Sequence, residues 1–224
     1  MANPKIGALV VGQSPRPEIE AEIHALAGGS IDLDLRGALD GLSRQEIDAL
    51  TPESAADTLF TRLPNGDGVR ISKRRVVEHG TAKLEALAAA GYDVTLVMCT
   101  GDFPDWMGRF RVIFPSRTMN AMVKACLPEG KLGVFTPLAE QCPKSEARWR
   151  AAGYDAKVVA LSPNAGEDEI REAAATLRDH RSELLVLDCM SYTRTTKKIA
   201  REVAGAPAIL AVSTAVRTVL ELAT

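Results

Sequence analysis

The sequence contains no long apolar run and no nucleotide or metal motif. None of its apolar stretches approaches the ~20 residues that a membrane-spanning helix needs. There is no P-loop and no G-x-G-x-x-G segment, which argues against a nucleotide ligand. No two cysteines form C-x-x-C, and neither Cys nor His falls at zinc-ligand spacing. We therefore expect no metal and no other cofactor.

Net charge and histidine are also scarce. The formal net charge of −2 at pH 7 gives no reason to expect nucleic acid as a partner. The three histidines are His24, His79 and His180, and all lie in helical patterns away from strand ends. This placement disfavours a Ser-His-Asp or Cys-His hydrolase, in which histidine must reach the nucleophile.

The cysteines and the start of the chain indicate a compartment. Cys99, Cys126, Cys142 and Cys189 show no disulfide spacing, and a chain of 224 residues can build a core without staples. The apolar residues 6–11 are too few for a signal peptide and are typical of a buried strand. We expect reduced thiols in a cytoplasmic protein without a membrane partner. Cys126, beside Leu127 in a helical pattern, is expected to belong to the core.

Strand and helix patterns alternate along the chain. Short Val- and Leu-rich segments predict strands at residues 6–11, 31–35, 94–98, 131–135, 157–160, 184–187 and 208–212. Helical patterns lie at residues 75–90, 118–126, 138–151, 167–181, 195–203 and 213–223. This alternation predicts βαβ crossovers and an α/β fold with mainly parallel sheets.

Residues 51–72 interrupt the alternation. The run Asn65-Gly66-Asp67-Gly68 is a strong turn signal between two strand-like segments, so we predict a β-hairpin inserted in the first half of the chain. Just before it, Ser43 and Glu46 have the spacing of a capping box at the start of a helix.

Two cysteines follow apolar strands. VTLVMCT ends its apolar run near Cys99, and ELLVLDC ends its run near Cys189. In α/β sheets, ligands bind beyond the carboxyl ends of the strands. A thiolate and a thiol acting on opposite faces of one carbon can remove and return a proton next to a carboxylate. The alternative for each cysteine is an ordinary buried position.

Residues beside strand ends are the candidate substrate-binding groups. They are Gln13, Ser14 and Arg16 after the first strand, Thr100 and Gly101 after Cys99, Thr136, and Met190, Ser191 and Tyr192 after Cys189. Backbone N–H groups in such loops favour anions, and Arg16 can pair with a carboxylate through two hydrogen bonds. The alternatives are a surface turn around Arg16, a helix cap at Thr136 and simple packing of Tyr192.

The cysteine segments resemble those of a known family. Residues 187–193, LDCMSYT, resemble the L-G-C-T-H-Y-P segment around the second catalytic cysteine of aspartate/glutamate racemases, and residues 98–101, MCTG, resemble the first. The whole chain is similar to the AroM-type branch of that superfamily, through LSRQE at 42–46, ISKRRV at 71–76, FPSR at 114–117 and LDC at 187–189. It departs from the racemase pattern at Ser191, where racemases have histidine, and at Gln13, where they have aspartate.

The resemblance implies a fold and a reaction. It implies two pseudo-symmetric lobes, one of residues 1–115 completed by a C-terminal helix at 213–224, and one of residues 116–212. It also implies that Cys99 and Cys189 act as an acid/base pair, without pyridoxal phosphate, on a small carboxylate such as an amino acid. The superfamily includes racemases of amino acids and hydantoins, malonate decarboxylases and maleate isomerases.

Three alternatives stay open. One is an isomerase or decarboxylase that uses a single cysteine. Another is a non-catalytic regulatory protein that binds a small carboxylate. The third concerns assembly, since relatives in the superfamily are often dimers or larger, which leaves a homo-oligomer open.

Overall fold

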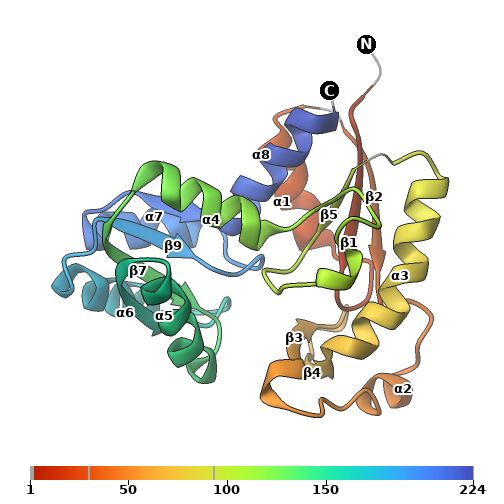
Figure 1. Cartoon of the computed structure of the whole chain (residues 1–224), viewed down its shortest axis with the longest axis horizontal. Coiled ribbons are helices and arrows are strands. Elements are labelled where there is room, and N and C mark those ends of the chain that lie inside the picture. The colour runs from red at the N-terminus through yellow and green to blue at the C-terminus, as the bar shows by residue number, and fades with distance from the viewer. Residues whose placement is uncertain (1–2, 30, 93, 224) are drawn as a thin grey trace. The chain divides into compact units, whose positions relative to one another are not determined.

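The computed structural model describes residues 3–29, 31–92 and 94–223. The chain divides into two compact units (Figure 1). Unit 1 comprises Met1–Phe114 and Val216–Thr224, and unit 2 comprises Pro115–Ala215. The last helix, α8 (Ala211–Ala223), begins in unit 2 and continues into unit 1. Thr224, the final residue of the predicted C-terminal helix, lies outside the described residues.

Unit 1 is built on a parallel sheet in the order β2-β1-β5-β6. Its strands are β1 (Lys5–Val10), β2 (Asp32–Gly37), β5 (Thr95–Val97) and β6 (Val112–Ile113). The helices are α1 (Pro17–Ala27), α2 (Arg44–Asp48), α3 (Lys73–Ala89) and the short 3-10 turns η1 (Ala55–Asp57) and η2 (Pro104–Trp106). The central strands β1 and β5 are buried almost throughout, as parallel strands covered on both faces must be.

The predicted hairpin is present in unit 1. Strands β3 (Thr58–Arg62) and β4 (Gly68–Ser72) pair antiparallel. Gly66 adopts φ +94 in the turn, a conformation that favours glycine, which explains why the turn signal was readable. The capping box is also confirmed, since Ser43 accepts from the N–H of Glu46 and donates its own N–H to the Glu46 carboxylate.

Unit 2 is built on a second parallel sheet, in the order β10-β9-β7-β8. Its strands are β7 (Gly130–Thr136), β8 (Tyr154–Ala160), β9 (Leu184–Leu187) and β10 (Ala208–Leu210). Its helices are α4 (Pro115–Cys126), α5 (Cys142–Ala151), α6 (Glu167–Asp179) and α7 (Arg194–Ala204), with the 3-10 turn η3 (Ala139–Gln141). Among the described helices, none has both the length and the apolar character needed to cross a membrane.

The two sheets share one topology. Counted in chain order within each unit, the strands lie in the order 2-1-3-4 in both sheets. The strand at the edge beside the first strand is β2 in unit 1 and β8 in unit 2. Each is less buried than the strand it pairs with, β1 or β7. The prediction of two similar α/β units with mainly parallel sheets and a hairpin in the first is therefore confirmed.

Two predicted boundaries and one prediction of burial are wrong. The strand predicted at residues 208–212 ends at Leu210, and α8 begins at Ala211 without an intervening loop. The helix predicted from residue 138 begins at Cys142 after the turn η3. Cys126, predicted to be core, is exposed at the end of α4. A run of consecutive apolar residues fits a buried strand and a buried helix equally well, which explains the first error.

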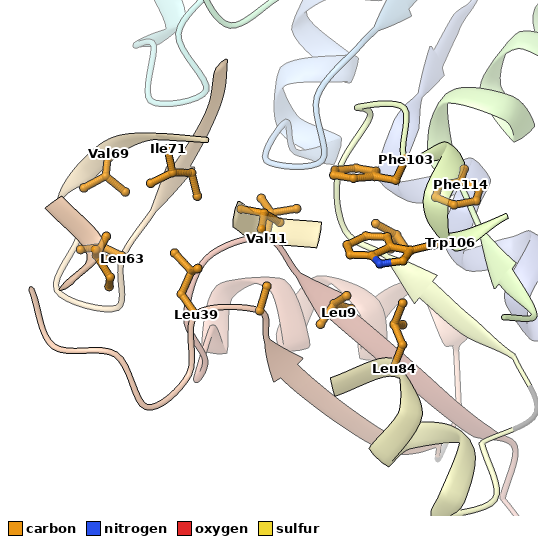
Figure 2. Close-up of a cluster of buried hydrophobic side chains, with 14 residues drawn as sticks. Leu9, Val11, Leu39, Leu63, Val69, Ile71, Leu84, Phe103, Trp106 and Phe114 are labelled. Carbon is orange, nitrogen blue, oxygen red and sulfur yellow. The ribbon is translucent and has the colours of Figure 1, made fainter. Parts of the chain in front are cut away.

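The core of unit 1 extends from the sheet to the hairpin. Figure 2 shows Leu9 and Val11 of the first strand region with Leu63, Val69 and Ile71 of the hairpin and with the aromatic rings of Phe103, Trp106 and Phe114. Phe103 and Trp106 stack with their ring centroids 4.7 Å apart. Gly80 of α3 leaves room for this stack, because a Cβ there would lie 2.8 Å from the Trp106 ring. This packing supports the loop that follows Cys99.

Candidate functional site

Cys99 and Cys189 occupy the same position in their respective units. Each lies two residues beyond the third strand, since β5 ends at Val97 and β9 ends at Leu187. The intervening residue donates its N–H to the penultimate residue of the first strand in both units. The hydrogen bonds are Met98 N to Leu9 O at 2.8 Å and Asp188 N to Phe135 O at 3.0 Å. The backbone thus places both thiols at the carboxyl end of a central strand, where α/β proteins bind ligands.

Each of the two sulfur atoms is also contacted by a backbone N–H group two residues further along the chain. The N–H of Gly101 points to Cys99 Sγ at 3.3 Å, and the N–H of Ser191 points to Cys189 Sγ at 3.4 Å. An N–H directed at sulfur favours the thiolate, the form that acts as base. Both cysteines are half-buried, as is Thr100 after the first of them. The same turn therefore directs a backbone N–H at the sulfur in each unit.

Aromatic packing surrounds Cys99. The residue packs against the hydrophobic cluster of unit 1 that contains the Phe103 ring. A Cβ on Gly101 would lie 3.2 Å from that ring and 3.3 Å from Cys99 Sγ, so glycine lets the chain turn tightly around the sulfur. The ammonium group of Lys73 lies 5.8 Å from the centroid of the Phe103 ring. Cys99 therefore packs against an apolar core whose Phe103 ring also contacts a cation.

A charged pair adjoins Cys189. Asp188 is buried, and its Oδ2 accepts a hydrogen bond from Arg148 Nη2 at 2.7 Å. Burial raises the pKa of the Cys189 thiol to about 11, and the negative charge of Asp188 adds to the rise, while the N–H groups of Ser191 and Tyr192 oppose it. The pKa of the Cys189 thiol therefore lies above the range of an ordinary thiol.

The candidate residues after β1 are engaged within unit 1. Gln13 donates through Nε2 to the carbonyls of Leu39 and Leu42, at 3.2 and 2.8 Å. Ser14 donates both its N–H and its hydroxyl to the carboxylate of Asp40, each at 2.7 Å. These bonds tie the segment after β1 to the segment after β2, which fixes the turn but occupies the donors.

Arg16 is buried rather than exposed in a surface turn. Its Nε pairs with Glu18 at 2.5 Å and its Nη1 donates to the carbonyl of Arg62 at 3.0 Å. It therefore links α1 to the hairpin. To bind a substrate carboxylate through two hydrogen bonds, it would have to exchange one of these partners.

The candidate substrate-binding residues of unit 2 differ in whether their side chains are exposed and free to bind a ligand. Thr136 is buried and donates to Gln141 Oε1 at 2.9 Å, so its hydroxyl supports η3. Tyr192 is buried and donates to the carbonyl of Leu161 at 2.6 Å, which fixes its ring. Met190 is buried, whereas Ser191 is exposed. Within this unit, Ser191 is thus the candidate whose side chain is accessible beside Cys189.

Sequence reasoning missed Asp188, Arg148 and Asp40. Asp188 stands in the LDC segment, directly after four apolar strand residues, and a buried acid needs a partner. That pattern was a usable signal for Asp188. Arg148 and Asp40 carried no such signal, because their partners lie 40 and 26 residues away in the chain.

The remaining cysteines have other surroundings. Cys142 begins α5 and is half-buried, and burial with the nearby Glu146 raises the pKa of its thiol. Cys126 is exposed. Neither follows a strand, so we assign neither a role in the chemistry.

Each unit has a four-stranded parallel sheet of one topology with a cysteine beyond its third strand. Several solved structures share this two-unit α/β fold. The maleate isomerase Iso from Pseudomonas putida S16 is 13% identical, with a TM-score of 0.65 over 99% of this chain and 93% of that one. Arylmalonate decarboxylase is 13% identical, with a TM-score of 0.63 over 99% and 93%. Glutamate racemase from Aquifex pyrophilus is 16% identical, with a TM-score of 0.58 over 98% and 84%.

A family model covers nearly the whole chain. The model of the family described as AroM protein matches residues 6–223, and the chain belongs to this family. No curated protein matches the sequence.

Proposed function

We propose that the protein is a cofactor-independent enzyme of racemase or epimerase type, which moves a proton at the carbon next to a carboxylate with Cys99 and Cys189 as its acid/base pair. The observation that carries this proposal is the equivalence of the two thiols. Each lies two residues past the third strand of its unit and accepts a backbone N–H at 3.3–3.4 Å. The structures similar to this chain include racemases, a decarboxylase and an isomerase.

The chemistry needs one sulfur in each protonation state. A thiolate removes the proton from the carbon, and the electron pair left behind delocalises into the adjacent carboxylate. A thiol then delivers its own proton to the opposite face of that carbon. Two protons and two sulfurs balance: the sulfur that began as thiolate ends as thiol, and the other ends as thiolate.

The carboxylate of the substrate needs hydrogen-bond donors as negative charge develops on it. Thr100 and Ser191 are the accessible candidates, one after each cysteine. We assign Gln13, Ser14, Arg16, Thr136 and Tyr192 to the support of this site, because the structure pairs their donors internally. Met190 and Gly101 contribute packing and a tight turn beside the two thiols.

A substrate screen in heavy water tests the proposal. Amino acids, hydroxy acids and hydantoins are incubated with the protein, and NMR follows loss of the signal from the proton on the reacting carbon. We expect exchange with one group of small acids, and a loss of at least ~100-fold in racemisation for Cys99→Ser and for Cys189→Ser. Cys126→Ser, at an exposed position, is the matched control and should keep full turnover. Full turnover by both active-site variants would refute the two-thiol mechanism.

A one-thiol reaction is the second candidate. The unequal surroundings of the two cysteines favour it, since only Cys189 adjoins a buried acid, and the fold is shared with a maleate isomerase and a decarboxylase. It predicts that one cysteine variant is inactive while the other keeps most of its turnover. Tight binding of a small acid without any exchange would instead indicate a non-catalytic binding protein.

A further inference from the structure

Asp188 is a buried acid whose hydrogen bonding is incomplete. The residue is 9% exposed, and Oδ2 is held by Arg148 Nη2 at 2.7 Å. Its other oxygen, Oδ1, is buried and has no hydrogen-bond partner among the residues that the structure describes. Leaving a buried carboxylate oxygen unsatisfied is costly, and native proteins keep few such groups without a reason. Packing alone does not provide one, because an apolar side chain would fill the position at lower cost.

Unit 1 shows what an apolar residue does at the same place. The residue before Cys99 is Met98, which is buried and donates the same backbone hydrogen bond as Asp188. The two strand ends therefore present the same backbone and the same N–H to sulfur, but one thiol follows an uncharged side chain and the other follows a carboxylate. At the position before the cysteine, the two units therefore differ by one carboxylate.

The other groups near Cys189 in unit 2 do not cancel this charge. The Arg148 guanidinium is partly exposed and lies 4.9 Å from the centroid of the Trp149 ring, so it is shared between Asp188, that ring and solvent. Tyr192 keeps its proton, because burial raises the pKa of its hydroxyl, which donates to Leu161 O. Cys142 on α5 is a second thiol with a raised pKa, and Glu146 and Lys157 act on it.

We propose that Asp188, held in place by Arg148, is a positioning residue that keeps Cys189 in its proton-bearing form, so that Cys189 is the proton donor of the resting enzyme. A negative charge in a water-poor site disfavours a second one on the neighbouring sulfur. The role as donor rests on the proposed function. In the reaction, the Cys189 S–H bond breaks as its proton bonds to carbon, and the proton taken from the substrate stays on the other sulfur.

The protonation of Cys189 can be measured without a substrate. In a variant with Cys99, Cys126 and Cys142 replaced by serine, Cys189 is the sole thiol, and its ionisation is followed by thiolate absorbance and by the rate of alkylation against pH. We expect the thiol to titrate well above the ordinary range in this parent. Asp188→Asn should lower the pKa by at least one unit, which gives about ten times more thiolate at about pH 8.

Arg148→Gln separates an electrostatic role from a structural one. It breaks the same ion pair as Asp188→Asn, but it leaves the carboxylate charged in the range where the thiol titrates. We expect the pKa of Cys189 to stay the same or rise. Arg148 is partly exposed on α5, and circular dichroism checks that each variant is folded before its thiol is titrated. Asp179→Asn, on an exposed residue of α6, is the control and should change nothing.

The outcomes are distinct. An ordinary pKa for Cys189 in the parent, or a fall of similar size in Asp188→Asn and Arg148→Gln, would overturn the inference. If the screen in heavy water finds no exchange but the two variants shift the pKa in the expected directions, the control of Cys189 by Asp188 stands and the proposed function fails. If exchange is found and the pKa shifts are absent, the proposed function stands and the control of Cys189 by Asp188 fails.

Discussion

The segments 98–101 and 188–191 hold their cysteines with the same backbone geometry but among different side chains. Both follow a buried third strand, both bond back to the first strand, and both direct an N–H at sulfur. In unit 1 the surroundings are Met98 and an aromatic layer, whereas in unit 2 they are a buried ion pair and a fixed tyrosine. The comparison teaches that topology places a thiol, while the side chains around it set its proton affinity.

The aromatic layer of unit 1 should matter most for stability. Trp106 is fully buried, stacks on Phe103 and donates Nε1 to Thr81 Oγ1 at 3.1 Å. Trp106→Ala should reduce the free energy of unfolding by about 3–5 kcal/mol, as measured by urea denaturation. The counterpart in unit 2 is Trp149, whose buried Nε1 has no hydrogen-bond partner in the described part of the chain. Trp149→Phe should be close to neutral, and a loss as large as that of Trp106→Ala would contradict the comparison.

The raised pKa of Cys189 predicts a dependence of stability on pH. The folded protein holds this proton up to about pH 11, whereas the unfolded chain releases it near pH 9.0. The stabilisation is complete below pH 9.0 and is lost as the pH rises through the folded value, up to roughly 2–3 kcal/mol. Urea denaturation at several alkaline pH values measures the slope. Cys189→Ala should flatten this slope, whereas Cys126→Ala should not. Equal slopes in the unmodified protein and the two variants would contradict the raised pKa of Cys189.

The residues that donate N–H to sulfur should differ in tolerance. Gly101→Ala places a Cβ 3.2 Å from the Phe103 ring and 3.3 Å from Cys99 Sγ, so we expect a loss of about 1–3 kcal/mol. The equivalent Ser191 is exposed, and Ser191→Ala keeps its backbone donor. Thermal unfolding of the two variants should therefore show a clear fall for the first and almost none for the second. A reversed order would mean that the two turns are not equivalent.

Helix caps should give the smallest effects and similar ones in the two units. Ser43 caps α2 in unit 1, and Thr193 caps α7 in unit 2 by accepting from the N–H of Thr196 at 3.1 Å. Removing either hydroxyl by substitution with alanine should cost about 1 kcal/mol in urea denaturation. A much larger loss at Thr193 would assign that hydroxyl, near the Cys189 loop, a role beyond capping.

Features with a local cause were predictable. The hairpin turn was readable because Asn65-Gly66-Asp67-Gly68 suits a tight turn, and strand 184–187 because its apolar run is bounded by polar residues. The capping box at Ser43 depends on two residues three apart. The end of β10 was not predictable, because apolar residues at 208–212 satisfy a strand and a helix alike.

The site was predictable only in part. The positions of Cys99 and Cys189 at strand ends followed from the strand pattern. The partners of Ser14 and Arg16 did not, since Asp40 and the carbonyl of Arg62 come from other elements. The exposure of Cys126 was also missed, because a helical pattern does not state which face lacks a neighbour.

Most strands and helices, the hairpin and a thiol after each third strand could be predicted from the residues alone, since these depend on nearby residues and on the period of apolar side chains, whereas the bounds of α1 and the strand β6 were missed. Only the tertiary structure decided that a carboxylate at the end of β9 meets a guanidinium from α5, and that an aromatic layer closes over the equivalent turn of unit 1. Burial and long-range pairing set the energy of a charge, and neither can be read from a residue's neighbours in the chain.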